Sequence, residues 1–132
     1  MKASIIQYPI GEDARGDLGY LNMGDHIPFE VRRVFYIVDI PPATHRGGHA
    51  HYHHEELIIV VRGAMTVTLD DGCETREFLL QASQGALYIP RMTWLDFSTH
   101  SLETTCLVLT SNPYSEADYI RDHNEFLSQV NL

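Results

Sequence analysis

His49 and His51 are the residues of this chain whose types and spacing point most directly to chemistry. They flank Ala50, and two side chains separated by one residue on a β-strand project to the same side. The run from Leu57 to Val61 that follows is wholly apolar and is typical of a core strand. Two imidazoles would therefore face one pocket from a rigid wall. Imidazole serves in such a place as a metal ligand or as a proton carrier near neutral pH.

Glu56 adds a third group that could act together with the two histidines. Imidazole and carboxylate are ordinary ligands of transition metals, and catalytic metal sites usually take three or more of them. The order His49, His51, Glu56 and then the turn residue Gly63 thus fits two kinds of site. One is a metal centre, and the other is a site for proton transfer. The residue types alone leave both open.

Length, charge and cysteine content limit the class of protein. The 132 residues predict one domain spanning 1–132, and a net charge of -9 argues against a nucleic-acid partner. A few local arginines could still bind a small anion. Cys73 and Cys106 lie far apart and are predicted to be free thiols in a reducing compartment. We find no signal peptide and no membrane span, and we expect a cytoplasmic protein.

Short β-prone runs bounded by turn residues make up most of the chain. The predicted strands are 4–8, 34–38, 49–61, 64–69, 77–80, 86–89, 94–97 and 104–109. Strands of this length with regular turns are typical of an antiparallel sandwich or barrel. At the C-terminus, Ser115 and Asp118 form a capping pattern, and apolar residues then recur with helical spacing. We therefore predict a short C-terminal helix.

The segment from His49 to Gly63 resembles the first signature motif of the cupins. Gly85 and Pro90 match part of the second cupin motif, but Trp94-Leu95-Asp96 stand where its histidine is expected. The resemblance implies an all-β fold, the cupin double-stranded β-helix or jelly-roll barrel, with a pocket between its sheets. Because the fourth ligand is missing, a metal at this site would be held more weakly or more openly.

A narrower resemblance covers residues 28–127. Motifs at 32–39, 46–51, 69–72, 87–90 and 118–122 occur in one order that is similar to the WxcM-like cupins, the dTDP-4-keto-6-deoxyglucose 3,4-ketoisomerase family. This resemblance implies a metal-independent isomerase that needs no cofactor. Its substrate would be a thymidine-diphosphate keto-sugar in deoxysugar or surface-polysaccharide (O-antigen) biosynthesis. It also implies a homodimer, in which the N-terminal strand and loop at 1–28 could be swapped between partners.

Two positions depart from the pattern of that family. Tyr52 stands where lysine is usual, and Glu56 stands where glutamine is usual. Glu56 restores the cupin ligand type, so a metal-dependent cupin enzyme using His49, His51 and Glu56 is the first alternative. A non-catalytic, sugar-binding cupin is the second.

The ketoisomerase resemblance suggests a role for each candidate residue. Moving a ketone from C4 to C3 needs a base for the C3 proton and a donor for the developing oxyanion. We expect His51 to be the base and His49 to orient or assist it. Tyr36 is expected to be a further catalytic residue that donates to a sugar oxygen or shuttles a proton. Substrate contacts are expected from Arg46 (to the diphosphate or a sugar oxygen) and, at the nucleotide end, from Arg33, Arg91 and Trp94. On residue type alone, Tyr36 and Trp94 are also typical packing residues. His53 and His54 are expected at the rim.

Overall fold

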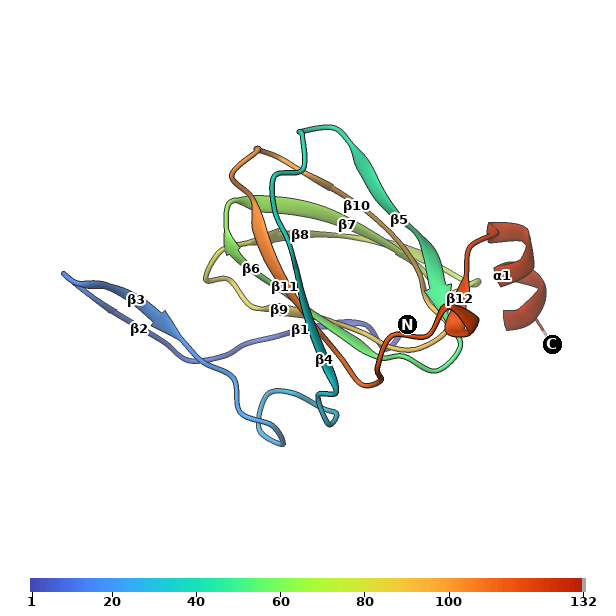
Figure 1. The fold of residues 1–132 in the computed structure, drawn as a ribbon, viewed down its shortest axis with the longest axis horizontal. Helices are drawn as coiled ribbons and strands as arrows, with labels where there is room; N and C mark the ends of the chain where they lie inside the picture. The colour runs from blue at the N-terminus through green and yellow to red at the C-terminus, as the bar shows by residue number, and fades with distance from the viewer. Residues whose placement is uncertain (132) are drawn as a thin grey trace.

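The computed structural model describes residues 1–131, and ten of its strands form two antiparallel sheets that face each other (Figure 1). The first sheet has the order β1 (Ser4–Ile6), β9 (Ala86–Ile89), β6 (Glu56–Arg62), β11 (Thr105–Thr110) and β4 (Arg33–Ile37). The second has the order β12 (Tyr119–Ile120), β5 (His45–His51), β10 (Trp94–Thr99), β7 (Ala64–Asp70) and β8 (Thr75–Gln81). This is the all-β cupin jelly-roll barrel that the sequence predicts.

Alternation along the strands builds the core between the sheets. In β7, Met65, Val67 and Leu69 are fully buried, whereas the threonines between them are partly exposed. Strand β6 is buried on both faces. Ile58 and Val60 belong to the core between the sheets, and Leu57 and Ile59 to a second cluster with Ile27 on the outer face. Its unbroken apolar run is explained by this double burial.

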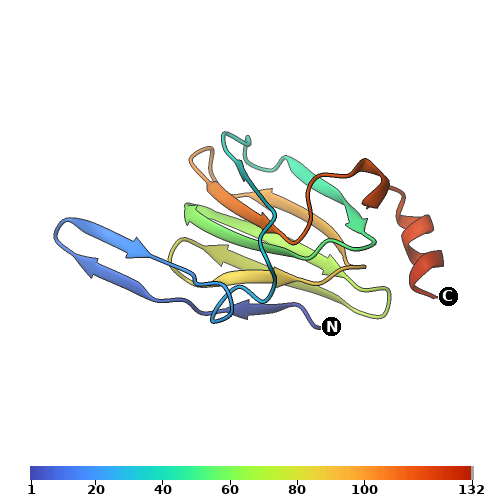
Figure 2. The ribbon, with the colours of Figure 1, turned by 60° about the horizontal axis from the view of Figure 1, so that its bottom comes forward.

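The N-terminal region extends the first sheet and then leaves the barrel. Strand β1 pairs with β9 of the same chain, with Ile5 opposite Leu87. A hairpin of β2 (Ile10–Asp13) and β3 (Gly16–Gly19) then projects away from the two sheets (Figures 1 and 2). The predicted N-terminal strand is thus confirmed, and its exchange with a partner chain stays a prediction.

The C-terminal segment differs from its prediction in detail. The predicted short helix is confirmed as α1 (His123–Val130), but it begins later than the Ser115 pattern indicates. Asp122 caps α1, its carboxylate accepting from the Glu125 amide at 3.0 Å. Ser115 instead precedes a short 3₁₀ helix, η1 (Glu116–Asp118), and makes no side-chain cap. Two residues between these helices form β12, because they pair with β5.

None of the helices within residues 1–131 has the length and apolar character needed to cross a membrane.

Gly47 fixes the approach of β5 to β10. Its φ is +90°, and a Cβ there would lie 2.6 Å from the Leu95 carbonyl oxygen. We expect Gly47→Ala to lower the free energy of unfolding by about 2–4 kcal/mol, since backbone strain and a backbone clash add. Gly24→Ala is the matched control, because Gly24 has φ +88° but open space around it. Denaturant unfolding should show a clearly smaller loss for the control, and equal losses would contradict the proposed clash.

Candidate active site

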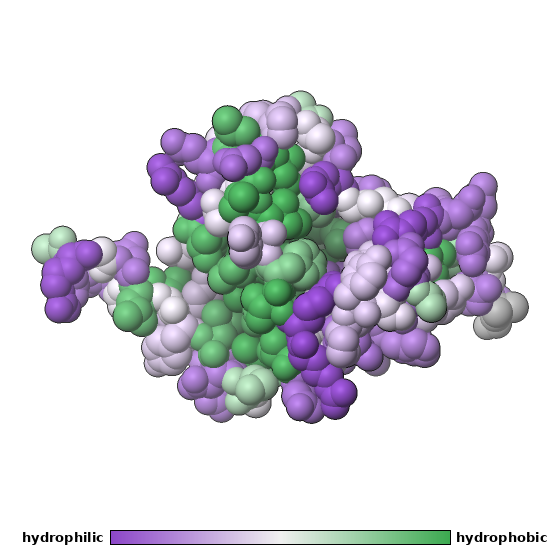
Figure 3. All heavy atoms as spheres, in the orientation of Figure 1, coloured by the Kyte–Doolittle hydropathy of each residue, from purple (hydrophilic) through white to green (hydrophobic). Residues whose placement is uncertain are grey.

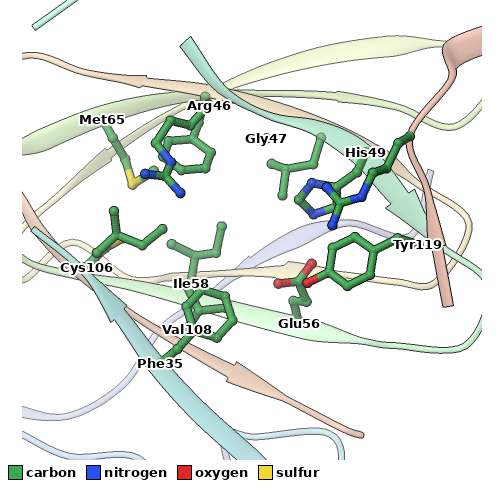
Figure 4. Close-up of a pocket in the computed structure, with 14 residues that line it drawn as sticks. Phe35, Arg46, Gly47, His49, Glu56, Ile58, Met65, Cys106, Val108 and Tyr119 are labelled. Atoms are coloured by element: carbon green, nitrogen blue, oxygen red, sulfur yellow. The ribbon is translucent and has the colours of Figure 1, made fainter. Parts of the chain in front are cut away.

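A cavity of about 240 Å³ lies between the two sheets. Figure 4 shows His49, Glu56 and Tyr119 together on one side and Met65 and Cys106 on the other. Its apolar lining consists of Phe35, Ile37, Ile58, Met65, Leu95, Phe97, Cys106 and Val108. Its polar lining consists of Arg46, His49, Glu56, Tyr119 and Arg121. Charged and hydrogen-bonding groups therefore face a largely apolar wall across a small space.

The two histidines of β5 project to the same side, as the sequence predicts. Their ring centroids lie 4.9 Å apart. Strand β12 places the Tyr119 ring against both, at 5.0 Å from His49 and 4.4 Å from His51. Their access to a ligand differs, because His49 lines the cavity whereas His51 is only 4% exposed and does not. His49 is thus the imidazole that a molecule in the cavity would meet.

His49 has the protonation state that a base requires. Burial lowers the pKa of His49 below its usual value, because removal from water disfavours the imidazolium. The nearby Glu56 carboxylate raises the pKa, but the effect of burial is larger. The ring is therefore neutral at neutral pH and can accept a proton.

His51 lies behind the cavity wall with a partner at each ring nitrogen. Its Nε2 is 3.3 Å from Glu56 Oε1, and its Nδ1 is 3.0 Å from His54 Nδ1 and 3.4 Å from Asp118 Oδ2. His54 is 2% exposed, so the prediction that it lies at the rim is wrong. The chain bends after β5 ends at His51, which breaks the strand alternation and turns His54 inward. His53 is exposed, which agrees with its predicted position.

Asp118, Tyr119 and Arg121 lie at or beside the cavity, although the sequence pattern predicts no role for them. Tyr119 pairs with His51 and Ile120 with Ala50, and this pairing brings the segment to the cavity. The Arg121 guanidinium lies over the Tyr119 ring at 4.2 Å, and Glu116 accepts from it at 2.8 and 3.0 Å. The motif at 118–122 was visible in the sequence, but only the pairing with β5 shows where it lies.

Tyr36 does not reach the cavity, contrary to the predicted catalytic contact. Its side chain is 68% exposed, whereas its neighbours Phe35 and Ile37 line the cavity. Strand alternation explains this, because residues of β4 on either side of Tyr36 face inward and Tyr36 must face outward. Phe35 and Ile37, which face inward, carry no hydroxyl. Among the residues that line the cavity, the phenol is supplied by Tyr119.

The predicted substrate-binding residues divide into two groups. Arg46 lines the cavity, and its guanidinium reaches into it (Figure 4). Arg33 lies beside the lining residue Phe35, with its guanidinium 4.9 Å from that ring. Arg91 and Trp94 do not line the cavity, and their predicted contacts with the nucleotide end of the substrate stay predictions. Arg91 is exposed and donates to the Tyr52 carbonyl at 2.9 Å, and Trp94 packs against α1, 5.8 Å from the Phe126 ring.

Cys106 adds no nucleophile to the cavity at neutral pH. Burial raises the pKa of its thiol to about 11, so the thiolate is scarce. The side chain acts as part of the apolar wall.

Three groups beside the cavity could hold a metal ion. The ligand atoms of His49, His51 and Glu56 lie within 4.8 Å of one another. Leu95, from the segment where the second cupin motif has its histidine, lines the cavity with an aliphatic side chain instead. The donor types fit a divalent ion with an incomplete set of protein ligands. Such an ion would supply Lewis-acid polarisation of a bound carbonyl.

Comparison with known proteins identifies the family of this chain. The family model described as "FdtA: WxcM-like, C-terminal" matches residues 1–131. The chain belongs to the WxcM-like family. A curated relative, the TDP-4-oxo-6-deoxy-α-D-glucose 3,4-oxoisomerase of Aneurinibacillus thermoaerophilus, is 33% identical over 135 residues. That match covers 100% of this chain and 97% of the relative.

Solved structures agree with the assignment to the WxcM-like family. A 3,4-ketoisomerase from Helicobacter canadensis is 36% identical with a TM-score of 0.92, covering 99% of this chain and 98% of the other. The TDP-quinovose 3,4-ketoisomerase of Campylobacter jejuni is 35% identical with a TM-score of 0.90, covering 96% and 98%. The family predicted from the five sequence motifs is thereby confirmed, and the chain is an isomerase of the ketoisomerase type.

Proposed function

We propose that this protein converts dTDP-4-keto-6-deoxyglucose into a dTDP-3-keto-6-deoxyhexose. The observation that carries the proposal is the position of His49 on the wall of a small cavity that it shares with Glu56 and Tyr119, where burial lowers the pKa of the imidazole. The name of the relative that is 33% identical supports this substrate. A place in cytoplasmic deoxysugar or surface-polysaccharide biosynthesis follows from the substrate.

The size of the cavity indicates which part of the substrate enters it. Pockets for whole drug-sized ligands are about 300–1,000 Å³. A cavity of about 240 Å³ suits the keto-sugar ring, so the diphosphate and the nucleoside would lie outside it. Arg46 and Arg121 line the cavity, and both residues are exposed to solvent. They are the cations that could contact the sugar oxygens or the diphosphate.

The reaction moves two protons and needs no change in overall oxidation state. His49 takes the proton from C3, the C3–H electron pair forms the C3–C4 double bond, and O4 becomes an enediolate oxygen. The same proton, or one exchanged with water, is then delivered to C4. The proton of the O3 hydroxyl passes to O4, so that O3 becomes the C3 carbonyl oxygen and O4 becomes the new hydroxyl. His49 as base reverses the division of roles predicted from the sequence, because His51 lies behind the wall.

Developing charge on O4 requires a donor inside the cavity. Tyr119 supplies a hydroxyl at the polar side, next to His49, and takes the role predicted for Tyr36. Oriented donors in a site with little water stabilise an oxyanion best. The Arg121 guanidinium lies over the Tyr119 ring at 4.2 Å and helps to hold that ring at the polar side of the cavity.

Incubation with dTDP-4-keto-6-deoxyglucose in deuterated water tests the proposal. The product, followed by NMR, should carry the ketone at C3, and the C4 configuration would be read in the same spectrum. The fraction of deuterium at C4 would measure how much of the transferred proton exchanges with water. Binding of the nucleotide sugar without any conversion would contradict the proposal and support a non-catalytic sugar-binding cupin.

The pH profile should reflect the lowered pKa of His49. Only the neutral ring can accept the C3 proton, so kcat/KM should fall on the acid side, through a pKa below the ordinary histidine value of 6.5. Glu56→Gln removes a charge that raises this pKa, so the acid limb should move to still lower pH. A limb that stays in place in the Glu56→Gln variant would show that another group controls it.

A metal-dependent reaction is the alternative that a specific observation favours, namely the grouping of His49, His51 and Glu56. Metal analysis of the purified protein distinguishes the two proposals. Proton transfer by the side chains alone predicts that a chelator leaves turnover unchanged. A transition metal present in equal amount to the chain, lost together with activity and restored with it, would favour the alternative.

We further propose that the protein acts as a homodimer. The outer face of β4 exposes Val34 and Tyr36, and Val38 follows directly after the strand; these three residues are 57%, 68% and 42% exposed. Figure 3 shows apolar residues gathered on the face of the molecule where β4 lies. A monomer rarely exposes a continuous apolar patch without a partner. A second copy of this chain is the partner that the family resemblance suggests.

Tyr36→Asp should weaken the dimer by placing a charge in this apolar patch. We expect the molar mass from light scattering to shift from dimer toward monomer as the protein is diluted. Thr68→Asp, on the second sheet, is the control and should leave the mass unchanged. A Tyr36→Asp variant that remains as dimeric as the wild type would place the interface elsewhere.

A further inference from the structure

Four buried side chains form a chain of contacts that starts at Asp118, directly before β12, and ends at Glu56 on the cavity wall. Asp118 Oδ2 is 2.5 Å from His54 Nδ1, which is 3.0 Å from His51 Nδ1. The other nitrogen of His51, Nε2, is 3.3 Å from Glu56 Oε1. The exposed fractions of all four are between 2% and 7%. Glu56 lines the cavity, so the line connects the interior of the protein with the site.

The partners of His54 determine which of its nitrogens carry protons. Its Nε2 lies 2.9 Å from the Pro113 carbonyl oxygen, which can only accept, so Nε2 is an N–H. Its Nδ1 faces Asp118, whose two oxygens already accept from the backbone amides of His53 and His54 at 2.9 and 3.1 Å. A carboxylate held by two amides also only accepts, so Nδ1 is an N–H as well. His54 is thus an imidazolium paired with Asp118.

The proton on His54 Nδ1 then sets the tautomer of His51. Two N–H groups cannot face each other at 3.0 Å, so His51 Nδ1 carries no proton and accepts the hydrogen bond from His54. The single proton of a neutral His51 therefore sits on Nε2, where it points at the Glu56 carboxylate. The hydrogen bond made by one ring nitrogen of a histidine decides which of the two nitrogens carries the proton. Here that bond is the one from His54 to His51 Nδ1.

The spacing of the cluster favours a proton over a metal ion at its centre. His51, His54 and Asp118 could in principle bind a cation, since their ligand atoms lie within 4.8 Å of one another. Two ligands of a tetrahedral zinc ion, at about 2.0–2.2 Å from it, are about 3.3–3.6 Å apart. The 2.5 Å between His54 Nδ1 and Asp118 Oδ2 is too short for that arrangement and fits a charge-assisted hydrogen bond.

We propose that His54, held by Asp118 and the Pro113 carbonyl, is a positioning residue that keeps His51 in the Nε2–H tautomer. His51 in turn holds the Glu56 carboxylate at the cavity wall, beside the base His49. This inference rests on the ketoisomerase function proposed above for its kinetic consequence, but the tautomer itself can be observed without turnover.

Two variants of nearly equal size separate the proposed role from simple packing. His54→Leu removes both donors, so His51 should move its proton to Nδ1 in order to donate to Asp118. His54→Asn places an amide N–H near the position of Nδ1 and should preserve the wild-type tautomer. His53→Asn is the control, since His53 is exposed and its backbone amide, which donates to Asp118, is unchanged.

Long-range ¹H–¹⁵N NMR of the histidine rings reads the tautomer, with the His51 signals assigned by their loss in His51→Asn. We expect Nε2–H in the wild type, His53→Asn and His54→Asn, and Nδ1–H in His54→Leu. Steady-state kinetics should show kcat reduced about 10- to 100-fold in His54→Leu, as for outer groups that orient an active-site histidine, with KM changed much less. His54→Asn should recover most of kcat.

Three results would overturn the inference. They are an Nδ1–H tautomer in the wild type, an unchanged Nε2–H tautomer with normal kcat in His54→Leu, and a stoichiometric metal whose removal alters the His51 and His54 signals. If His54→Leu does not fold, His54→Asn still decides, because a changed tautomer in that variant contradicts the proposal. A wild-type protein that has the expected tautomer but no turnover would remove the proposed function and leave the tautomer assignment intact.

Discussion

Replacement of His49 by asparagine is expected to reduce kcat by about 10²- to 10⁴-fold, the range that positioned acid–base groups contribute. Asparagine retains a polar side chain but cannot accept the C3 proton. Binding of the nucleotide sugar should persist, because the cations that line the cavity, Arg46 and Arg121, are untouched. Single-turnover NMR for the chemical step and calorimetry for binding would measure the two effects separately.

The same comparison with His51→Asn tests which histidine is the base. With His49 as base, deuterium exchange at C3 should disappear in His49→Asn but survive at a reduced rate in His51→Asn. The physical reason is that His51 acts through Glu56 and does not line the cavity. Exchange that survives in His49→Asn and disappears in His51→Asn would restore the roles predicted from the sequence.

Removal of the Asp118 carboxylate should give a large loss of stability. Asp118 is only 7% exposed, and it pairs with buried His54 and accepts from two backbone amides. Asp118→Ala leaves a buried cation and two amides without partners, so we expect the free energy of unfolding to fall by about 3–5 kcal/mol. Urea unfolding at neutral pH, monitored by Trp94 fluorescence and circular dichroism, would measure it.

A double variant separates the unpaired charge from the loss of packing. His54→Leu with Asp118→Ala removes both charges, so it should be clearly more stable than Asp118→Ala alone. Glu116→Ala is the surface control, since the Glu116–Arg121 pair is exposed, and it should change stability little. If the double variant is as unstable as the sum of the two single losses, the two groups do not act as a pair.

Local pattern determined most of the strands and the chemistry of β5. The period of two places His49 and His51 on one side wherever β5 lies, and the alternation in 64–69 and 104–109 matches β7 and β11. The apolar run at 57–61 marks a central strand for a similar reason, because both of its faces are buried. These features depend on near neighbours in the chain, so the sequence displays them directly.

Which side of a strand faces the cavity was decided by tertiary structure. The alternation of β4 is equally clear in either register, and only the packing of Phe35 and Ile37 against the second sheet shows that Tyr36 points outward. Trp94 and Arg91 were predicted to contact the nucleotide end of the substrate on the basis of their position in the sequence. The same alternation turns Trp94 toward α1 and leaves Leu95 to line the cavity.

The sequence by itself determined the strand content, the family and the histidine pair, because each depends on local spacing. Only the tertiary structure decided the division of roles within that pair. Strand β12 comes from a segment about 70 residues further along the chain, and its pairing with β5 covers His51, brings Tyr119 to the cavity and buries His54 against Asp118. Hydrogen bonds between segments so far apart leave no periodic mark in the sequence, so the exposed base and its buried support could be told apart only in the folded chain.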